Sequence, residues 1–122
     1  MNPANAFIAL GALGCLLGVA TGAFGAHALE QSVSPGRLDT WEKAVDYLFV
    51  HSLGLLLVGT LDRLEPRACH RWAGGLMFAG IVLFSGSLFV LVLSGVAKLG
   101  MVTPFGGVAF ILAWLLLAVC YL

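Results

Sequence analysis

Residues 72–97 read WAGGLMFAGIVLFSGSLFVLVLSGVA, and this stretch decides the fold because none of its side chains is charged. At a rise of 1.5 Å per residue, roughly 20 helical residues cross the ~30 Å hydrocarbon core of a bilayer. The stretch is longer than that, so it predicts a transmembrane helix. Residues 3–26 and 99–122 are equally free of charged side chains and predict two more.

A fourth span is less clean, because its uncharged part runs only from Tyr47 to Leu61. We extend it back through Asp46 and Lys43 towards Trp41. Charged side chains near a helix end can pair along the helix or reach the membrane surface, which lowers the cost of their position. The sequence therefore predicts four spans.

Proline and threonine mark where these helices begin and end. A proline inside a helix costs about 3 kcal/mol, and all four prolines fall between the apolar stretches or at their edges. Thr40 and Thr103 are candidate N-cap residues, and Pro104 would then take the first helical position. The predicted transmembrane helices cover residues 4–29, 40–61, 70–96 and 104–121. We expect an all-α integral membrane four-helix bundle that forms a single membrane domain over residues 1–122.

The composition is typical of an integral membrane protein. Hydrophobic residues make up 61% and charged residues 10%, with a mean hydropathy of +1.04, whereas roughly 25% of residues are charged in an average soluble domain. The formal net charge is zero, which argues against a nucleic-acid partner because such proteins carry concentrated basic surfaces. The expected partners are the lipid bilayer and, beyond it, a homo-oligomer or another membrane protein.

No pattern in the sequence indicates an enzyme. A nucleophile elbow, a Walker loop, a Rossmann glycine fingerprint and an H-E-x-x-H motif are all missing. Cys15, Cys69 and Cys120 are far apart, odd in number and without metal-ligand spacing. We interpret them as small apolar fillers or a free loop thiol, and we expect no cofactor and no metal.

Glycine in the first predicted helix gives the strongest local pattern. Five glycines lie within roughly 80° of one another on a helix with about 100° per residue. They are Gly11, Gly14, Gly18, Gly22 and Gly25. Such a glycine zipper lets a second helix backbone approach closely, whether that helix belongs to the same chain or to another. A glycine-lined path for an ion or a lipid is the alternative interpretation.

Histidine inside the membrane is the second feature, because ionisable groups are costly there and mark candidate functional sites. His51 lies ten residues after Trp41, about 15 Å along the helix, and so close to mid-bilayer. His27, near the end of the first helix, would approach it if the first two helices are neighbours. The candidate hydrogen-bond partners of His51 are His27, Tyr47, Ser85, Ser87 or a backbone carbonyl. A structural neutral imidazole, a proton relay or ligand site, and a metal or haem ligand all remain open.

Four spans place both termini on one membrane side together with the loop 62–69. Three basic residues lie on each side: Arg63, Arg67 and Arg71 on the first, Arg37, Lys43 and Lys98 on the second. The tight arginine cluster predicts that both termini are cytoplasmic. Trp41 and Trp72 begin helices at opposite faces and Tyr121 ends the last helix, the positions of an aromatic interface belt.

Several segments together resemble one family of small membrane proteins. These segments are Gly22 to Leu29 (GAFGAHAL), then Trp41, Ala44, Tyr47 and His51, then Phe84 to Leu88 (FSGSL), and Thr103 to Gly107 (TPFGG). In this order they resemble domain of unknown function 423, also grouped as UPF0382 and related to transmembrane protein 256. The resemblance covers nearly the whole chain and implies a four-helix protein of the bacterial plasma membrane. It also implies that the following belong to the family pattern: His27, Trp41, Tyr47, His51, Ser85 and Pro104. The resemblance assigns no catalytic residues to this chain.

Three functions compete at this point. The first is a non-enzymatic membrane module that packs against or binds a partner or lipid through the glycine-rich face. The second is an oligomeric small transporter or channel with His51 as a protonatable group, since four helices alone enclose little of a pathway. The third is a ligand-binding or redox accessory that uses His27 and His51.

Overall fold

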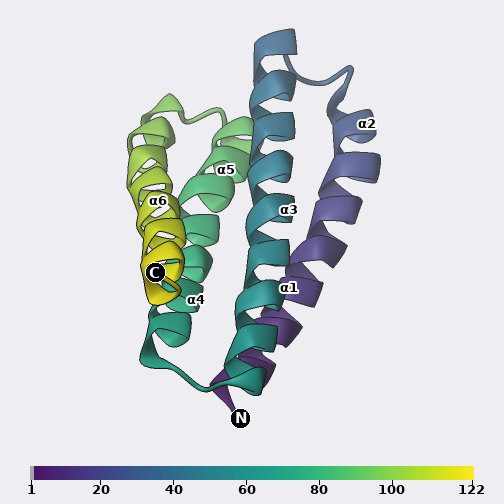
Figure 1. The fold of residues 1–122 in the computed structure, drawn as a ribbon. Coiled ribbons are helices and arrows are strands. Elements are labelled where there is room, and N and C mark those ends of the chain that lie inside the picture. The colour runs from purple at the N-terminus through teal and green to yellow at the C-terminus, as the bar shows by residue number, and fades with distance from the viewer. Residues whose placement is uncertain (1) are drawn as a thin grey trace.

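A computed structural model describes residues 2–122, which fold entirely into helices and short connections (Figure 1). The first span comprises α1 (Pro3–Val19), a π-helical segment η1 (Ala20–Gly25) and α2 (Ala26–Leu29). The second is α3 (Pro35–Leu64). The third comprises α4 (Ala68–Gly80), a second π-helical segment η2 (Ile81–Gly86) and α5 (Ser87–Ser94), and the fourth η3 (Ala97–Met101) and α6 (Thr103–Cys120). All four are long and apolar enough to cross a membrane, so the all-α, four-span prediction is confirmed.

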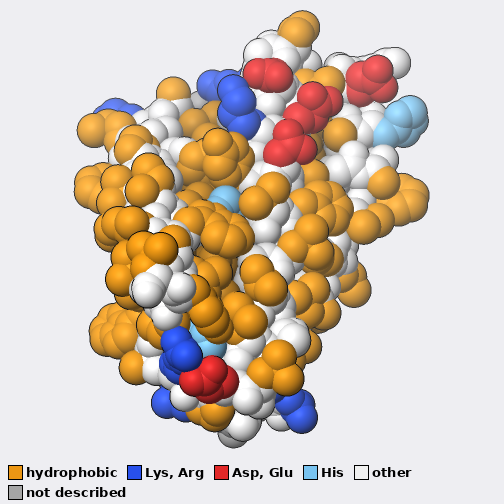
Figure 2. Space-filling model, in the orientation of Figure 1, with side chains coloured by type: hydrophobic (Ala, Val, Ile, Leu, Met, Phe, Trp, Pro, Cys, Tyr) orange, Lys and Arg blue, Asp and Glu red, His pale blue; other side chains and the backbone are white. Residues whose placement is uncertain are grey.

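The second span lies at the centre of the bundle. α3 packs against α1 on one side and against α4, η2 and α5 on the other, while α6 packs mainly on α4 and η2 (Figure 1). Hydrophobic side chains cover the flank between the two ends of the molecule, and the charged ones gather at those ends (Figure 2). This distribution suits a bundle whose middle lies in hydrocarbon.

Helix α3 is longer than the predicted range 40–61, and Thr40 is not its cap. Ser34 caps the helix instead, because its hydroxyl accepts a hydrogen bond from the Arg37 backbone N–H at 3.2 Å. Pro35 then takes the first helical position, and Thr40 lies inside the first turns, where its hydroxyl donates to the Gly36 carbonyl. At the last span, α6 starts at Thr103 with no side-chain cap, one residue earlier than expected.

The glycines of the first span face α3. A Cβ atom at Gly11 would lie 2.6 Å from the Ser52 carbonyl oxygen and 2.8 Å from the Leu56 backbone nitrogen. The next glycines meet α3 in register: Gly14 opposite Ser52, Gly18 opposite Phe49, Gly22 opposite Val45 and Gly25 opposite Trp41. The missing side chains bring two backbones of the same chain together. This glycine-rich face of the first span, in α1 and η1, is therefore covered within the bundle.

Candidate functional site

His51 is buried between α3 and α6, with 3% of its surface exposed. Its Nδ1 lies 2.8 Å from the Tyr47 carbonyl oxygen, and its Nε2 lies 3.0 Å from Trp114 Nε1. An indole N–H only donates, so Nε2 must accept and the ring proton must be on Nδ1, where it is donated to the carbonyl. Phe110 stacks on the ring with centroids 3.4 Å apart. His51 is thus a neutral imidazole with both nitrogens engaged inside the protein.

Beside this ring, a cleft of about 350 Å³ opens between α3 and α6. Its lining is largely aromatic and consists of Tyr47, Val50, His51, Phe84, Gly107, Phe110, Ile111 and Trp114. Tyr47 is 41% exposed and packs on Phe84 with centroids 4.3 Å apart. Within residues 2–122, the hydrogen bonds at this cleft join His51 to Tyr47 O and to Trp114, and none involves the Tyr47 hydroxyl. Tyr47 therefore brings to the lining of the cleft a hydroxyl that has no hydrogen-bond partner in the described residues.

The cleft lies in the membrane-spanning part of the bundle, towards the end at which α3 carries charged side chains. Tyr47 is about 18 Å along the helix axis from Pro35 and about 26 Å from Leu64, at 1.5 Å per residue. Phe110 is similarly about 10 Å and 15 Å from the two ends of α6. Tyr47 directly follows Asp46, so it is at the outer edge of the uncharged part of α3, and Phe110 continues the cleft into the hydrocarbon core.

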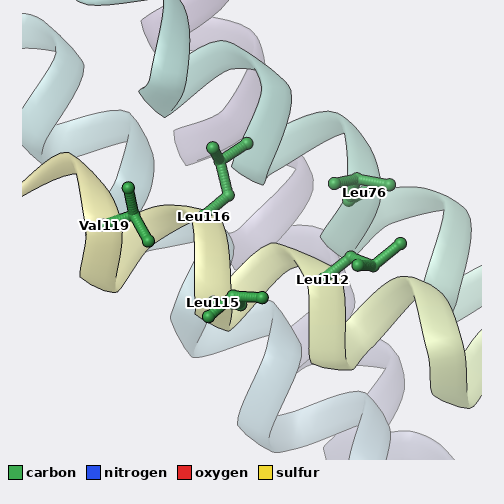
Figure 3. Close-up of a pocket in the computed structure, with 5 residues that line it drawn as sticks. All are labelled: Leu76, Leu112, Leu115, Leu116 and Val119. Carbon is green, nitrogen blue, oxygen red and sulfur yellow. The ribbon is translucent and has the colours of Figure 1, made fainter.

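Two other surface grooves have a different lining. One lies between α4 and α6, has a volume of about 330 Å³ and is lined only by aliphatic side chains (Figure 3): Leu76, Leu112, Leu115, Leu116 and Val119. A second, of about 320 Å³, lies between α1 and η2 and includes Thr21 and Ser85 among mostly apolar side chains. In the second groove both hydroxyls are already bonded to backbone carbonyls. The α3–α6 cleft is thus the one of these three with an uncommitted donor.

The remaining predicted site residues are not brought together at the cleft. His27 does not approach His51: Gly25 lies opposite Trp41, ten residues before His51, and the His27 side chain is 85% exposed and lies 3.6 Å from Glu30. Trp41 is not in an interface belt but 5% exposed, donating its indole N–H to the Thr21 carbonyl at 2.8 Å. Trp72, at 70% exposed, suits such a belt.

Ser85 and Ser87 do not bond to His51 either. The Ser85 hydroxyl donates to the Ala44 carbonyl at 2.8 Å and so ties η2 to α3. The Ser87 hydroxyl donates to the Phe84 carbonyl at 2.9 Å and lies 2.7 Å from the Thr103 hydroxyl. Trp114 and Phe110, which do contact His51, were not predicted, because nothing in the sequence relates their helix face to a histidine more than 50 residues away.

A second cluster forms where the loop after α3 meets the end of α6. Cys69 and Cys120 form a disulfide there, which corrects the interpretation of the cysteines as fillers or free thiols. Next to it the buried His70 places Nε2 2.7 Å from the Tyr121 hydroxyl and Nδ1 3.5 Å from Asp62 Oδ1. A signal for the pair was present, because the four-span topology puts both cysteines at the same membrane surface.

Replacing His51 tests whether it is structural. We expect His51→Gln to fold nearly as well as the unmodified protein, because an amide can also donate and accept. His51→Leu should lower the free energy of unfolding by about 1 to 3 kcal/mol, since it leaves the Trp114 N–H without an acceptor. Reversible unfolding in detergent measures both. In a Trp114→Phe background the leucine penalty should shrink, and an unchanged penalty would show that this hydrogen bond is not its cause.

The comparisons with known proteins agree on one family. The profile of the family described as "Protein of unknown function (DUF423)" matches residues 21–107. A UPF0382 membrane protein of Staphylococcus aureus (strain bovine RF122) is 48% identical over 113 residues, which cover 93% of this chain and 92% of that protein. The UPF0382 membrane protein YwdK of Bacillus subtilis is 49% identical over 114 residues, 93% of each chain. The search of solved structures finds no match.

Proposed function

This chain belongs to the DUF423 family of UPF0382 membrane proteins, and we propose that it is a non-enzymatic membrane module that binds a lipid-phase ligand in the α3–α6 cleft. The observation that carries the proposal is that Tyr47, 41% exposed and without a hydrogen bond at its hydroxyl, lines an aromatic cleft of about 350 Å³. The glycine-rich face of α1 is not the binding surface in this proposal, because α3 already covers it.

The chemistry of the cleft selects the ligand class. A tyrosine O–H donates to an oxygen acceptor, and flat aromatic walls favour a planar conjugated ring by stacking. The cleft begins beside Asp46 at the charged end of α3 and extends into the hydrocarbon core, so we expect its ligand to place an acceptor oxygen near Tyr47 and an apolar tail in the core. A lipid whose acceptor oxygens are on a planar ring and whose tail is hydrocarbon satisfies all three conditions. The isoprenoid quinones are lipids of this kind.

Both ring nitrogens of His51 are engaged with protein groups, and this gives less support to the alternative of an oligomeric transporter that moves protons through His51. Uptake of a second proton at Nε2 would break the hydrogen bond from Trp114, because that nitrogen could no longer accept. In the proposed module, His51 holds Trp114 and Tyr47 in place and so shapes the wall of the cleft.

A fluorescence titration tests the ligand. We expect a short-chain quinone added to the detergent-purified protein to quench tryptophan emission saturably, because Trp114 lines the cleft. Tyr47→Phe should weaken the apparent affinity about three- to tenfold, the effect of one hydrogen bond. Tyr121→Phe removes the other tyrosine hydroxyl, which lies outside the cleft at the end of α6, and should leave the affinity unchanged.

Filling the cleft provides a sharper pair of variants. Gly107 lines the cleft and Gly75 lies on the outer surface, and at both positions a Cβ has no atom within 4 Å. Gly107→Leu should abolish saturable quenching and Gly75→Leu should not. Saturable quenching in Gly107→Leu would contradict the site. A photoreactive residue introduced in place of Gly107 should crosslink to lipid. If it captured a second copy of the chain and no lipid, a self-association surface would be favoured instead.

We also propose that the protein is in the bacterial plasma membrane with both termini in the cytoplasm. Support comes from the relatives, which are membrane proteins of Staphylococcus and Bacillus, and from the arginines at the end that carries both termini. Two of these arginines contact the terminal segments: Arg63 donates to Asn5 Oδ1, and Arg67 donates to the Cys120 carbonyl. A reporter enzyme that works only in the cytoplasm should be active when it is fused after Leu122. Activity of an exported-phosphatase fusion at Leu122 would reverse the orientation.

A further inference from the structure

We propose that the Cys69–Cys120 disulfide is a thiol–disulfide exchange site, in which an incoming thiolate attacks Cys69 and Cys120 leaves as a thiolate. Both cysteines are half-buried, at the end of the bundle where the loop after α3 reaches the membrane surface. Reactive cysteines are partly exposed and have electropositive surroundings, whereas inert ones are enclosed in apolar side chains. This pair has the surroundings of the reactive type.

Arg67 provides the positive charge at one sulfur. Its Nη1 lies 3.8 Å from Cys120 Sγ and 3.0 Å from the Cys120 carbonyl oxygen, and the guanidinium stacks over the Tyr121 ring. Its Nε and Nη2 donate to Glu65, at 3.0 and 2.9 Å, which fixes the direction of the remaining N–H group. A thiolate formed on Cys120 would therefore find a charged donor already in place.

The two sulfurs differ in what stabilises their thiolates. Cys69 is in the first turn of α4, where the helix dipole favours a negative charge, and Cys120 is the last residue of α6, where the dipole disfavours it. A direct hydrogen bond from a charged group outweighs the partial charge of a helix end at a partly exposed position. Cys120 is consequently the better leaving group, because the thiol with the more stable thiolate leaves faster.

The proposed step conserves atoms and electrons. A thiolate of a small thiol or of a protein dithiol forms a bond to Cys69 Sγ while the Cys69–Cys120 bond breaks, and the bonding pair leaves on Cys120 Sγ. A second thiolate attacks the partner's own sulfur, so a partner disulfide forms and Cys69 is released. The chain gains two electrons and the partner thiols lose two. With cytoplasmic termini the site would face a thiol-rich compartment, where protein disulfides are typically transient.

Other charged groups surround the site and belong in the test. Asp62, on α3, is 2% exposed and accepts from the Arg67 backbone N–H at 3.0 Å, with Arg71 Nε 3.6 Å from its second oxygen. These contacts hold the loop in position and touch neither sulfur. Arg63, at the same end, donates to Asn5 and also does not contact the cysteines. Arg63→Gln is therefore a matched control for Arg67→Gln.

The experiment is partial reduction of the air-oxidised, full-length protein in detergent by glutathione, followed by acid quenching, alkylation and peptide mass spectrometry. We expect early adducts to carry glutathione on Cys69 and the alkyl group on Cys120. Arg67→Gln should slow reduction about three- to tenfold, Arg67→Lys should retain most of the rate, and Arg63→Gln should not change it. Repeating the reaction with a reduced protein dithiol compares the two thiol sources.

Three results would overturn the proposal. One is glutathione found mainly on Cys120, and another is an Arg67→Gln rate equal to that of the unmodified protein. The third is free thiols at both cysteines after air oxidation. If Arg67→Gln fails to fold, the adduct position in the unmodified protein and the rate of Arg67→Lys still decide the matter.

Discussion

Gly11→Leu is expected to lower the free energy of unfolding by about 3 kcal/mol, or to prevent folding altogether. Its Cβ would lie 2.6 Å from the Ser52 carbonyl oxygen and 2.8 Å from the Leu56 backbone nitrogen. Overpacking a close contact typically costs about 1 to 3 kcal/mol, and the cost is highest where the obstacle is backbone that has no other rotamer. Helices α1 and α3 would have to separate along their shared length.

Two other glycines calibrate this prediction. Gly18 faces only the ring of Phe49, with the nearest atom 2.8 Å from a Cβ, and that ring can turn away, so Gly18→Ala should cost less than Gly11→Ala. At Gly75 a Cβ meets nothing within 4 Å, so Gly75→Leu should be neutral or gain up to about 1 kcal/mol of helix propensity. Thermal or SDS unfolding of the four variants, Gly11→Leu, Gly11→Ala, Gly18→Ala and Gly75→Leu, ranks them. Equal stability of Gly11→Leu and Gly75→Leu would disprove the close α1–α3 contact.

Cys120→Ser is expected to lower the stability of the oxidised protein by up to about 4 kcal/mol. The disulfide joins residues separated by 51 positions, and closing a loop of this length removes that much entropy from a freely coiled unfolded chain. The value is an upper bound here, because an unfolded membrane protein retains much of its helix and so has less entropy to lose. Its main structural effect should be at the junction of α4 and α6, which the bond connects.

Reducing agent separates this effect from a simple packing defect. With excess dithiothreitol, the unmodified protein should become as unstable as Cys120→Ser, and the variant itself should not change. Cys15→Ser is the control, because Cys15 is a free cysteine in α1 and its replacement should leave the response to dithiothreitol intact. A stability of the unmodified protein that did not depend on dithiothreitol would show that the bond does not stabilise the fold.

Hydropathy and glycine spacing determined much of this molecule without any structure. Charge-free stretches longer than a bilayer is thick have few alternatives to transmembrane helices, because lipid offers backbone groups no hydrogen bonds. The helix limits were less predictable. Ser34, Thr40 and Thr103 are all chemically suited to capping, and only the path of the chain decides that Ser34 caps α3.

The candidate sites depended on contacts between distant segments. Periodicity places His51 mid-membrane, yet its partner Trp114 is on α6. The rotation of α6 depends on close contacts such as that of Gly106 with Phe84, which leaves no room for a Cβ atom at position 106. The distance between His27 and His51 follows from the offset of the first span against α3, which puts Gly25 opposite Trp41, and no local pattern encodes this offset.

The sequence by itself therefore determined that the protein is embedded in a membrane, how many spans it has and that its glycines form one narrow face. Each of these follows from local composition and a fixed helical repeat. Tertiary structure alone decided that α3 covers that face, that Tyr47 opens into an aromatic cleft and that Arg67 meets Cys120. The physical reason is that these contacts depend on the rotation and offset of whole helices, which result from the packing of all four at once.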